Sequence, residues 1–312
     1  IDGLVSPVQQ RNLEKEWGVK LLDRTGLILE IFSDRARTRE GVLQVEMAAL
    51  SYQRTRLVRA WTHLERQRGG FGFLGGPGES QLEADRRLIQ ERIARIEGQL
   101  ESVKKTRALH RKGRARVPYP VVALVGYTNA GKSSLLNRLT DADVLVEDRL
   151  FATLDATTRR LQLPGGEAVF VSDTVGFVRK LPHQLVEAFK STLDVVIDAD
   201  LLVHVVDSSD PDPEGSIAAV RVVLDEIGAG EVPELYVFNK ADVEPLVARR
   251  LVDREPGSVA ISSTTGEGID EMLAVMARRL RRQTIVAELL VPYERGDVLA
   301  LAHREGEVME TT

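Results

Sequence analysis

Residues 121–133 have the sequence VVALVGYTNAGKS, an apolar run followed by the pattern G-x-x-x-x-G-K-[ST]. The run predicts a buried strand and residues 134–139 predict a helix, so the loop between them leads into a helix N-terminus. Backbone N–H groups there converge on one point, where the helix dipole also favours negative charge. The predicted phosphate-binding residues are Gly126, Tyr127, Thr128, Asn129, Ala130, Gly131, Lys132, Ser133 and Ser134.

Two side chains of this loop have predicted roles in chemistry. Lys132 reaches the β- and γ-phosphates of a nucleotide and is a candidate catalytic residue. The Ser133 hydroxyl is a candidate Mg²⁺ ligand. The glycines at both ends let the backbone fold around a phosphate without an intervening side chain.

An N-K-x-D motif at residues 239–242 predicts which base is bound. It follows an apolar run, and the Asp242 carboxylate can accept from both N1–H and the exocyclic amine of guanine, a donor pair that adenine lacks. Asn239 can tie this loop to the phosphate-binding loop, and the Lys240 stem can cover a base face. A further loop after residues 259–261 is expected to back the guanine through Ser262, Ser263 and Thr264.

Two segments between these motifs are candidate switches. Asp173 ends a strand-like run at 168–172 and is expected to hold Mg²⁺, usually through water. Gly176 lets a backbone N–H approach the γ-phosphate and is a second candidate catalytic residue.

The Thr-rich segment 151–158 lies twenty residues beyond Ser133 and is the candidate switch I. Phe151 is expected near the nucleotide. Thr153 is our candidate for the second Mg²⁺ hydroxyl and for a catalytic role, and Thr157 and Thr158 remain the alternatives.

Five elements in this order predict a P-loop GTPase that uses GTP, GDP and Mg²⁺. From residue 121 to 282 strands and helices alternate, which predicts a mainly parallel, doubly wound α/β sheet with the nucleotide at the carboxyl ends of its strands. Phe177 stands where efficient GTPases carry a water-orienting Gln. Asn129 either helps to bind K⁺, as in related GTPases, or is an Asn tolerated in a turn.

Residues 37–112 predict two long helices with narrow apolar seams. The Gly-rich loop 69–78 joins them, so they are expected to form an antiparallel hairpin about 40 Å long at 1.5 Å per residue. The seam residues are Leu43, Met47, Leu50, Leu57, Trp61 and Leu64 in one helix, and Leu82, Ile89, Ile93, Ile96, Leu100 and Val103 in the other.

The net charge of −5 is unevenly distributed. Residues 35–120 hold 19 Lys and Arg against 9 Asp and Glu, a net of +10, which leaves −15 for the remainder. Such a block is either a solvated helical face or a surface that attracts phosphates. Tip phenylalanines either stack on splayed bases or close the loop. The candidate RNA-binding residues are Phe71, Phe73, Arg86, Arg87 and Arg92.

The flanking segments suggest parts of further domains. Residues 1–36 predict the tail of an N-terminal α/β domain, with a helix that starts with Pro7 and ends before Gly18, then a strand at 19–23. Thr25 is expected to cap a helix over 26–35, although residues 27–32 alone fit a strand equally well. Residues 113–120 predict a linker and 283–312 the start of a small C-terminal domain. The chain is therefore expected to be a portion of a longer protein.

Composition fits a cytoplasmic enzyme. A length of 312 residues suggests about two domains, and an apolar content of 43% allows a sizeable core. The chain has no cysteine, which excludes disulfides and thiolate metal sites. No apolar run approaches the ~20 residues that span a bilayer. A monomer without a DNA partner is expected.

Beyond the GTPase motifs, the chain resembles the HflX family, ribosome-associated GTPases of the Obg–HflX group. The resemblance covers nearly the whole chain and rests most specifically on GGFGFLGGPGESQLE at residues 69–83. One departure lies in the switch segment, where Ala156 replaces a proline that is usual in the family. Further matching segments are 12–15, 23–29, 35–38, 151–155 and 291–293.

The resemblance implies a factor that binds the large (50S) ribosomal subunit, its 23S rRNA and ribosomal proteins, and separates stalled or idle 70S ribosomes when GTP is bound. It also implies that the hairpin tip reaches toward the peptidyl-transferase region. Phe177 in place of Gln fits stimulation of hydrolysis by a large partner. A GTP-gated ribosome-assembly factor or RNA chaperone without splitting activity is the alternative.

Overall fold

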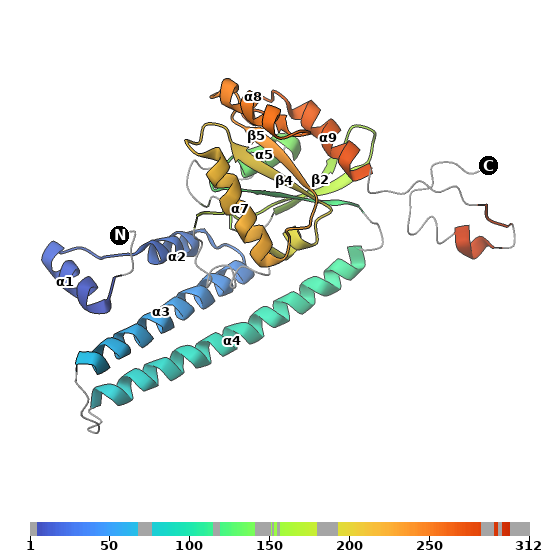
Figure 1. The fold of residues 1–312 in the computed structure, drawn as a ribbon. Helices are drawn as coiled ribbons and strands as arrows, with labels where there is room; N and C mark the ends of the chain where they lie inside the picture. The colour runs from blue at the N-terminus through green and yellow to red at the C-terminus, as the bar shows by residue number, and fades with distance from the viewer. Residues whose placement is uncertain are drawn as a thin grey trace. The chain divides into compact units, whose positions relative to one another are not determined.

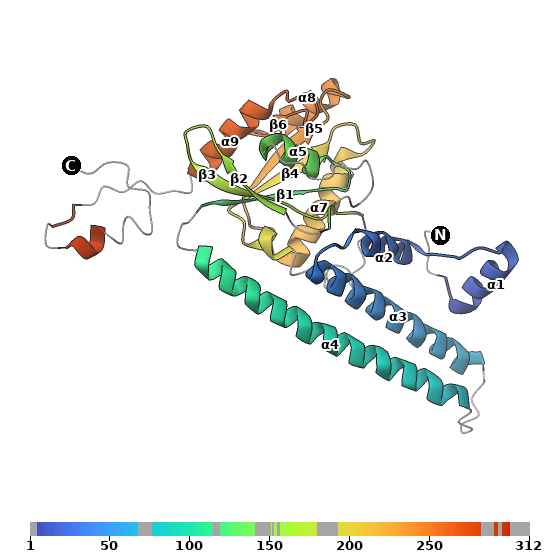
Figure 2. The same cartoon turned by 180° about the vertical axis from the view of Figure 1, so that it is seen from behind.

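The computed structural model describes residues 5–67, 77–114, 119–140, 151, 153–154, 157–179, 193–281, 290–292 and 295–299. The described residues up to Lys104 form one compact unit, and those from Lys105 onward form a second. Figures 1 and 2 label the helices and strands of both from opposite sides. Over the ranges that the structure describes, no helix is long and apolar enough to cross a membrane.

The first unit begins with two capped helices. Helix α1, Pro7–Trp17, has Ser6 as its N-cap with a capping box to Gln9, and Gly18 ends it in a left-handed conformation, as the sequence predicted. Helix α2 is Arg24–Arg35, so residues 27–32 are helical and not a strand. Its cap is Asp23, whose carboxylate accepts from the Gly26 N–H at 2.8 Å, and the prediction of Thr25 was wrong.

The predicted strand at 19–23 is absent from the described structure, where these residues connect the two helices. A strand needs a neighbour to pair its backbone groups. Here side chains of α1 take that place: the Leu21 N–H donates to Glu14 Oε1 at 2.9 Å, and Gln10 Nε2 donates to the Leu21 carbonyl at 2.9 Å. The backbone groups of Leu21 are therefore satisfied without a sheet.

Two long helices follow, α3 (Arg39–Gln67) and α4 (Pro77–Arg114), and the last residues of α4, from Lys105, are assigned to the second unit. They lie side by side in Figures 1 and 2. Leu43 packs on Ile96 and Leu100, and Arg92 pairs with Glu46 at 2.7 Å. The start of α3 thus meets the latter half of α4, the antiparallel arrangement expected for two helices joined by a short loop. The side chains of residues 57–82 and the whole of residues 68–76, including Phe71 and Phe73, lie outside the described structure.

The second unit is built on a six-stranded sheet in the order β2-β3-β1-β4-β5-β6. All neighbouring strands are parallel except β2 and β3, which confirms the predicted mainly parallel α/β sheet. The strands are β1 (Val121–Gly126), β2 (Thr157–Gln162), β3 (Ala168–Asp173), β4 (Leu201–Asp207), β5 (Glu234–Asn239) and β6 (Val259–Ala260).

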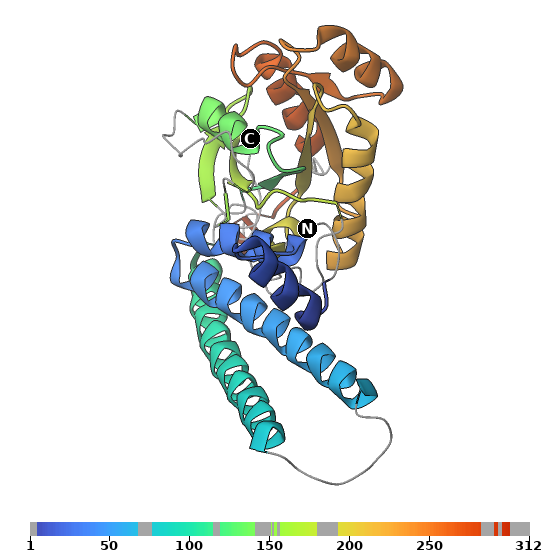
Figure 3. The same ribbon diagram turned by 90° about the vertical axis from the view of Figure 1, so that its left-hand side faces the viewer.

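Helices cover both faces of this sheet. On one face, α5 (Lys132–Thr140) and α9 (Ile269–Arg281) pack against the inward side chains of the central strands, among them Val203 and Val205. On the other, α7 (Pro213–Ile227) and α8 (Pro245–Arg254) pack on Val206 and Phe238. Figure 3 shows α5 in green and α7 in gold on opposite sides of the strands. Alternate residues of β4 therefore face different layers, as expected for a doubly wound sheet.

Candidate nucleotide-binding site

The phosphate-binding loop runs from the end of β1 to the start of α5. Gly126 and Gly131 have φ angles of 150° and 93°, which favour glycine. A Cβ on Gly126 would lie 2.2 Å from the Val205 carbonyl oxygen, and one on Gly131 would lie 2.2 Å from Asn239 Nδ2. Both glycines are therefore required by close approach to neighbouring elements, in addition to leaving room for a phosphate.

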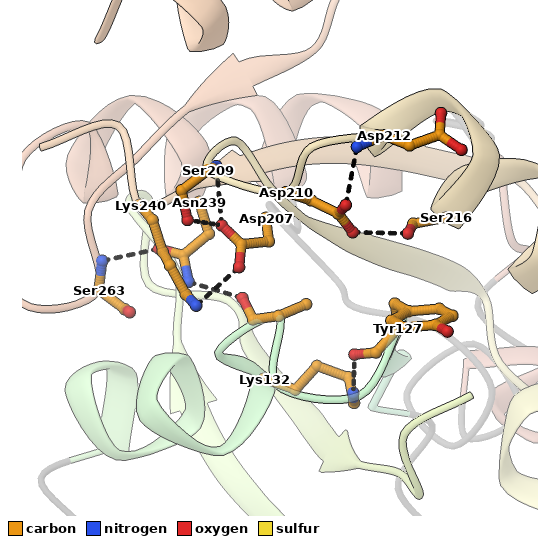
Figure 4. Close-up of polar contacts among 11 residues, drawn as sticks. Tyr127, Lys132, Asp207, Ser209, Asp210, Asp212, Ser216, Asn239, Lys240 and Ser263 are labelled. Atoms are coloured by element: carbon orange, nitrogen blue, oxygen red, sulfur yellow. Dashed lines mark hydrogen bonds and ion pairs between the residues drawn. The ribbon is translucent and has the colours of Figure 1, made fainter. Parts of the chain in front are cut away.

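The Lys132 side chain is folded back along this loop. Its ammonium donates to the backbone carbonyls of Gly126 at 3.1 Å and Tyr127 at 2.9 Å, and the residue is only 6% exposed. Burial lowers the pKa of Lys132 to about 8, against the opposing attraction of Asp173. Figure 4 shows the contact with Tyr127. A desolvated cation at the centre of a glycine loop is well placed to exchange carbonyl partners for phosphate oxygens.

Three oxygen-bearing side chains from different elements meet beside Lys132. The Ser133 hydroxyl donates to Asp173 Oδ2 at 2.6 Å and lies 2.7 Å from Thr153 Oγ1. Asp173 is fully buried, and within the described structure its Oδ1 has no hydrogen-bond partner. Burial raises the pKa of Asp173 although Lys132 opposes that shift. A buried carboxylate with one unpaired oxygen, beside two hydroxyls, suits Mg²⁺, which takes oxygen ligands.

The structure places the competing threonines elsewhere. Thr158 lies on β2, where its hydroxyl is 2.7 Å from Ser172 Oγ on β3. Thr157 is the first residue of β2, opposite Asp173 in the antiparallel ladder, and it does not line the pocket. Of the three threonines, Thr153 is the one that meets the Ser133 hydroxyl.

The residues after Asp173 pass directly over the phosphate-binding loop. A Cβ on Gly176 would lie 2.8 Å from Thr128 Cα and 3.2 Å from Lys132 Nζ, so a larger residue would press on the loop. Phe177 is completely buried and its backbone bonds to the loop: Phe177 N–H donates to Gly126 O at 3.1 Å, and Thr128 N–H donates to Phe177 O at 2.8 Å. In this conformation the ring packs and offers no hydrogen-bonding group to water.

The base-recognition loop is fixed to the phosphate loop through Asn239. Asn239 Nδ2 donates to the Ala130 carbonyl at 2.8 Å, and Asn239 Oδ1 accepts from the Ser263 N–H at 3.0 Å. Lys240 pairs with Asp207 at 2.7 Å. Figure 4 shows these contacts around a common space, so three loops from the carboxyl ends of β1, β5 and β6 share one hydrogen-bonded framework.

One pocket brings most of the predicted residues together. Gly126, Tyr127, Ala130, Asp173 and Ser262 do not line it and belong to its supporting framework. The sequence did not point to Thr174 and Val243, which also line the pocket; Thr174 had no signal of its own, and Val243 simply follows the N-K-x-D motif. The predicted residues that line it are Thr128, Asn129, Gly131, Lys132, Ser133, Ser134, Phe151, Thr153, Gly176, Asn239, Lys240, Asp242, Ser263 and Thr264.

The candidate RNA-binding arginines lie on α4 in the first unit. Arg86, Arg87 and Arg92 are all exposed. Arg92 donates from Nε to Glu46 of α3 at 2.9 Å, so part of its role is to join the two helices. Arg87 is 3.8 Å from Glu91, one turn further along.

Comparison with known families gives matches over most of the chain. A model described as "GTP-binding GTPase N-terminal" matches residues 1–33, and one described as "GTP-binding GTPase Middle Region" matches residues 35–114. A third, described as "50S ribosome-binding GTPase", matches residues 121–240. The last match contains the glycine loop, both switch candidates and the start of the N-K-x-D motif.

Two curated relatives share one name. A "GTPase HflX" of Magnetococcus marinus is 53% identical over 99% of this chain and 72% of its own length. The Escherichia coli "GTPase HflX" is 49% identical over 95% of this chain and 70% of its own length.

Among solved structures, the "SsGBP and GDP complex" aligns with a TM-score of 0.54 at 24% identity, covering 91% of this chain and 81% of that one. A GTP-binding protein of Sulfolobus solfataricus in complex with GDP gives a TM-score of 0.50, also at 24% identity, covering 90% of this chain and 80% of that one. At this level of identity the two structures establish the fold.

Proposed function

This chain belongs to the HflX family of GTPases, and on that premise we propose that it is a cytoplasmic factor of the large ribosomal subunit that separates 70S ribosomes when GTP is bound. It is a GTP-hydrolysing enzyme of the P-loop class. The observation that carries the proposal is the set of guanine-nucleotide elements around one pocket, most of which lie within residues 121–240, the match to a family described as a 50S ribosome-binding GTPase.

Within this proposal the nucleotide phosphates replace the carbonyl partners of Lys132. The glycine loop supplies backbone N–H groups, and Gly176 leaves space for the γ-phosphate beside the ammonium. Ser133, Thr153 and Asp173 would hold Mg²⁺, the last usually through water. Bound Mg²⁺ would neutralise charge that develops on the phosphate oxygens. Asp242 selects guanine, and K⁺ beside Asn129 is a further proposed cofactor.

Hydrolysis is proposed to depend on the partner. Phe177 lacks any group that could orient the attacking water, and its ring is buried. The group that positions water must therefore come from another part of the assembly or from a rearranged switch. Slow hydrolysis by the isolated protein and faster hydrolysis on the large subunit follow from this arrangement.

The hairpin of α3 and α4 is the proposed contact with 23S rRNA. Phosphates attract a basic surface without base specificity, which suits a rigid rod on a ribosomal crevice. Arg86 and Arg87 supply exposed charge on α4, and Arg92 is shared with Glu46. The tip residues Phe71 and Phe73 are proposed to stack on bases after the hairpin is seated.

Sucrose-gradient sedimentation of 70S ribosomes with the protein and GTP tests the proposal. We expect free 30S and 50S subunits with GTP and intact 70S particles with GDP. The Lys132→Ala variant serves as the matched protein control, because it keeps the hairpin and loses the nucleotide contact. Intact 70S particles with GTP, at protein concentrations that saturate 50S binding, would rule out splitting and leave the assembly-factor alternative.

A further inference from the structure

We propose that Asp207, at the carboxyl end of β4, is a positioning residue for guanine binding that holds Lys240 in place at the base end of the pocket. The proposal rests on the nucleotide assignment of that pocket and extends it to a residue outside the N-K-x-D motif. Asp207 does not line the pocket itself, so it acts through the lysine.

The contact is short and shielded. Lys240 Nζ lies 2.7 Å from Asp207 Oδ2, and the two side chains are 29% and 19% exposed. Parallel pairing of β4 and β5 puts Asp207 opposite Asn239, so Lys240 is the next residue along the neighbouring strand end. Ion pairs that are largely removed from water are screened less by salt than surface pairs. This pair can therefore fix a long side chain that would otherwise be free to move.

The carboxylate is itself held in one orientation. Asp207 Oδ1 accepts from the backbone N–H of Ser209 at 2.9 Å and from the Ser209 hydroxyl at 2.6 Å. The Ser208 N–H donates to the Asn239 carbonyl at 2.9 Å and locks the ends of β4 and β5 together. One oxygen of Asp207 is thus anchored to its own loop, and the other faces Lys240, as Figure 4 shows.

Lys240 is also constrained by its backbone. Its φ angle is 61°, in the left-handed region that residues with a Cβ seldom occupy. The following turn holds that conformation, because Val243 N–H donates to the Lys240 carbonyl at 3.0 Å and Ala241 N–H donates to the Ile261 carbonyl at 3.0 Å. With both the backbone and the ammonium fixed, the lysine stem remains along the pocket wall, where it can cover a base face.

The other acidic residues of the same loop have different partners. Asp210 accepts from the Asp212 N–H at 2.8 Å and from the Ser216 hydroxyl at 2.7 Å. Asp212 pairs with Arg179 at 2.6 Å and caps α7. None of these contacts of Asp210 and Asp212 involves a residue that lines the pocket. Asp210 is therefore a chemically matched control on the same loop.

Equilibrium titration of the full chain with fluorescently labelled GDP and IDP tests the role of Asp207. We expect Asp207→Asn to weaken both nucleotides about tenfold, because the pair positions a lysine over a surface that the two bases share. The ratio of GDP to IDP affinity should stay constant. Asp207→Glu should recover part of the loss, and Asp210→Asn should bind within twofold of the unaltered protein.

A double-mutant cycle separates positioning from a purely structural role. In a Lys240→Met background, which keeps the stem and removes the charge, Asp207→Asn should cause almost no further loss. An equal loss in both backgrounds, or unchanged affinity in the single variant, would overturn the role of Asp207 alone. Failure of the unaltered protein to bind GDP would instead overturn the nucleotide assignment and the proposal with it.

Discussion

The helical hairpin and the sheet unit use charge in opposite ways. In the hairpin, Arg86 and Arg87 of α4 are exposed, and Arg87 approaches Glu91 only to 3.8 Å. In the sheet unit, Lys132 and Asp173 are buried close together, and each is oriented by hydrogen bonds. An exposed Arg or Lys side chain attracts any phosphate group. A buried charge held by hydrogen bonds is compensated only by a ligand group that fits its position.

The two regions therefore differ in how closely their structure identifies a ligand. Around Lys132, measured hydrogen bonds and the unpaired Asp173 Oδ1 point to individual atoms that we propose to hold the nucleotide and Mg²⁺. The hairpin is known only to be basic and long, and its partner is proposed from family membership. Nucleotide binding in the first region should therefore respond to single-atom changes, whereas the basic surface of the hairpin should respond mainly to changes in its own charge.

Removal of the Lys132 ammonium should give the largest effect. We expect Lys132→Ala to lower GTP hydrolysis by at least about 100-fold, since one charged donor to the reacting phosphate is lost. The empty protein should melt at the same or a higher temperature, because a desolvated cation no longer has to be buried. Hydrolysis assays measure the loss of activity, and thermal melts measure the melting temperature of the empty protein. Undiminished hydrolysis would remove Lys132 from the site.

Conversion of the guanine acceptor should give the next largest effect. We expect Asp242→Asn to weaken GDP about 30-fold, because an acceptor of two hydrogen bonds from the base becomes partly a donor. The preference for GDP over IDP should fall, since IDP lacks the exocyclic amine. Asp253→Asn, an exposed change of the same type on α8, is the control. An unchanged GDP to IDP ratio in isothermal titrations would contradict the assignment of Asp242.

The sequence predicted the sheet unit well because its signals are local. The glycine loop, the strand before it and the helix after it adjoin one another, and the positive φ values at Gly126 and Gly131 explain why glycine stands there. Asp207 could not be selected in this way. Its contact with Lys240 depends on the register between β4 and β5, which the order of residues does not specify.

The errors in the first unit have the same origin. Residues 19–23 have a strand-like composition, but pairing depends on a partner that local sequence does not identify, and side chains of α1 bond to Leu21 instead. Thr25 and Asp23 are both residue types that cap helices well. The helix begins at Arg24, two residues before the predicted start, so Asp23 is the cap. The described part of the seams, where Leu43 packs on Ile96 and Leu100, was predictable because apolar residues three and four apart lie on one face of a helix.

Charge reversal on the hairpin should have a smaller and less specific effect. We expect Arg86→Glu with Arg87→Glu to weaken 50S binding about tenfold at low salt and to flatten its dependence on salt concentration. GDP affinity should not change. Arg249→Glu with Arg250→Glu makes the same change in charge on α8 of the sheet unit. Equal losses from the two pairs would mean that net charge matters and the hairpin does not.

The smallest expected effect is a pH dependence confined to the nucleotide site. In the empty protein the pKa of Lys132 is about 8, because burial disfavours its charged form. Bound phosphate favours the ammonium and raises that pKa, so binding above pH 8 must take up a proton. Affinity for GDP should therefore fall as pH rises, by about fourfold between pH 7 and 8.5.

Titration calorimetry in two buffers of different ionisation enthalpy measures this uptake directly. Lys132→Arg is the matched control, because a guanidinium keeps its charge over this range and any pH effect on the guanine base remains in both proteins. We expect the unaltered protein to take up most of one proton at pH 8.5 and the variant much less. Equal uptake in the two proteins would mean that Lys132 is already charged in the empty site. The contrast between a buried, titrating charge in the sheet unit and the exposed charges of the hairpin would then no longer hold.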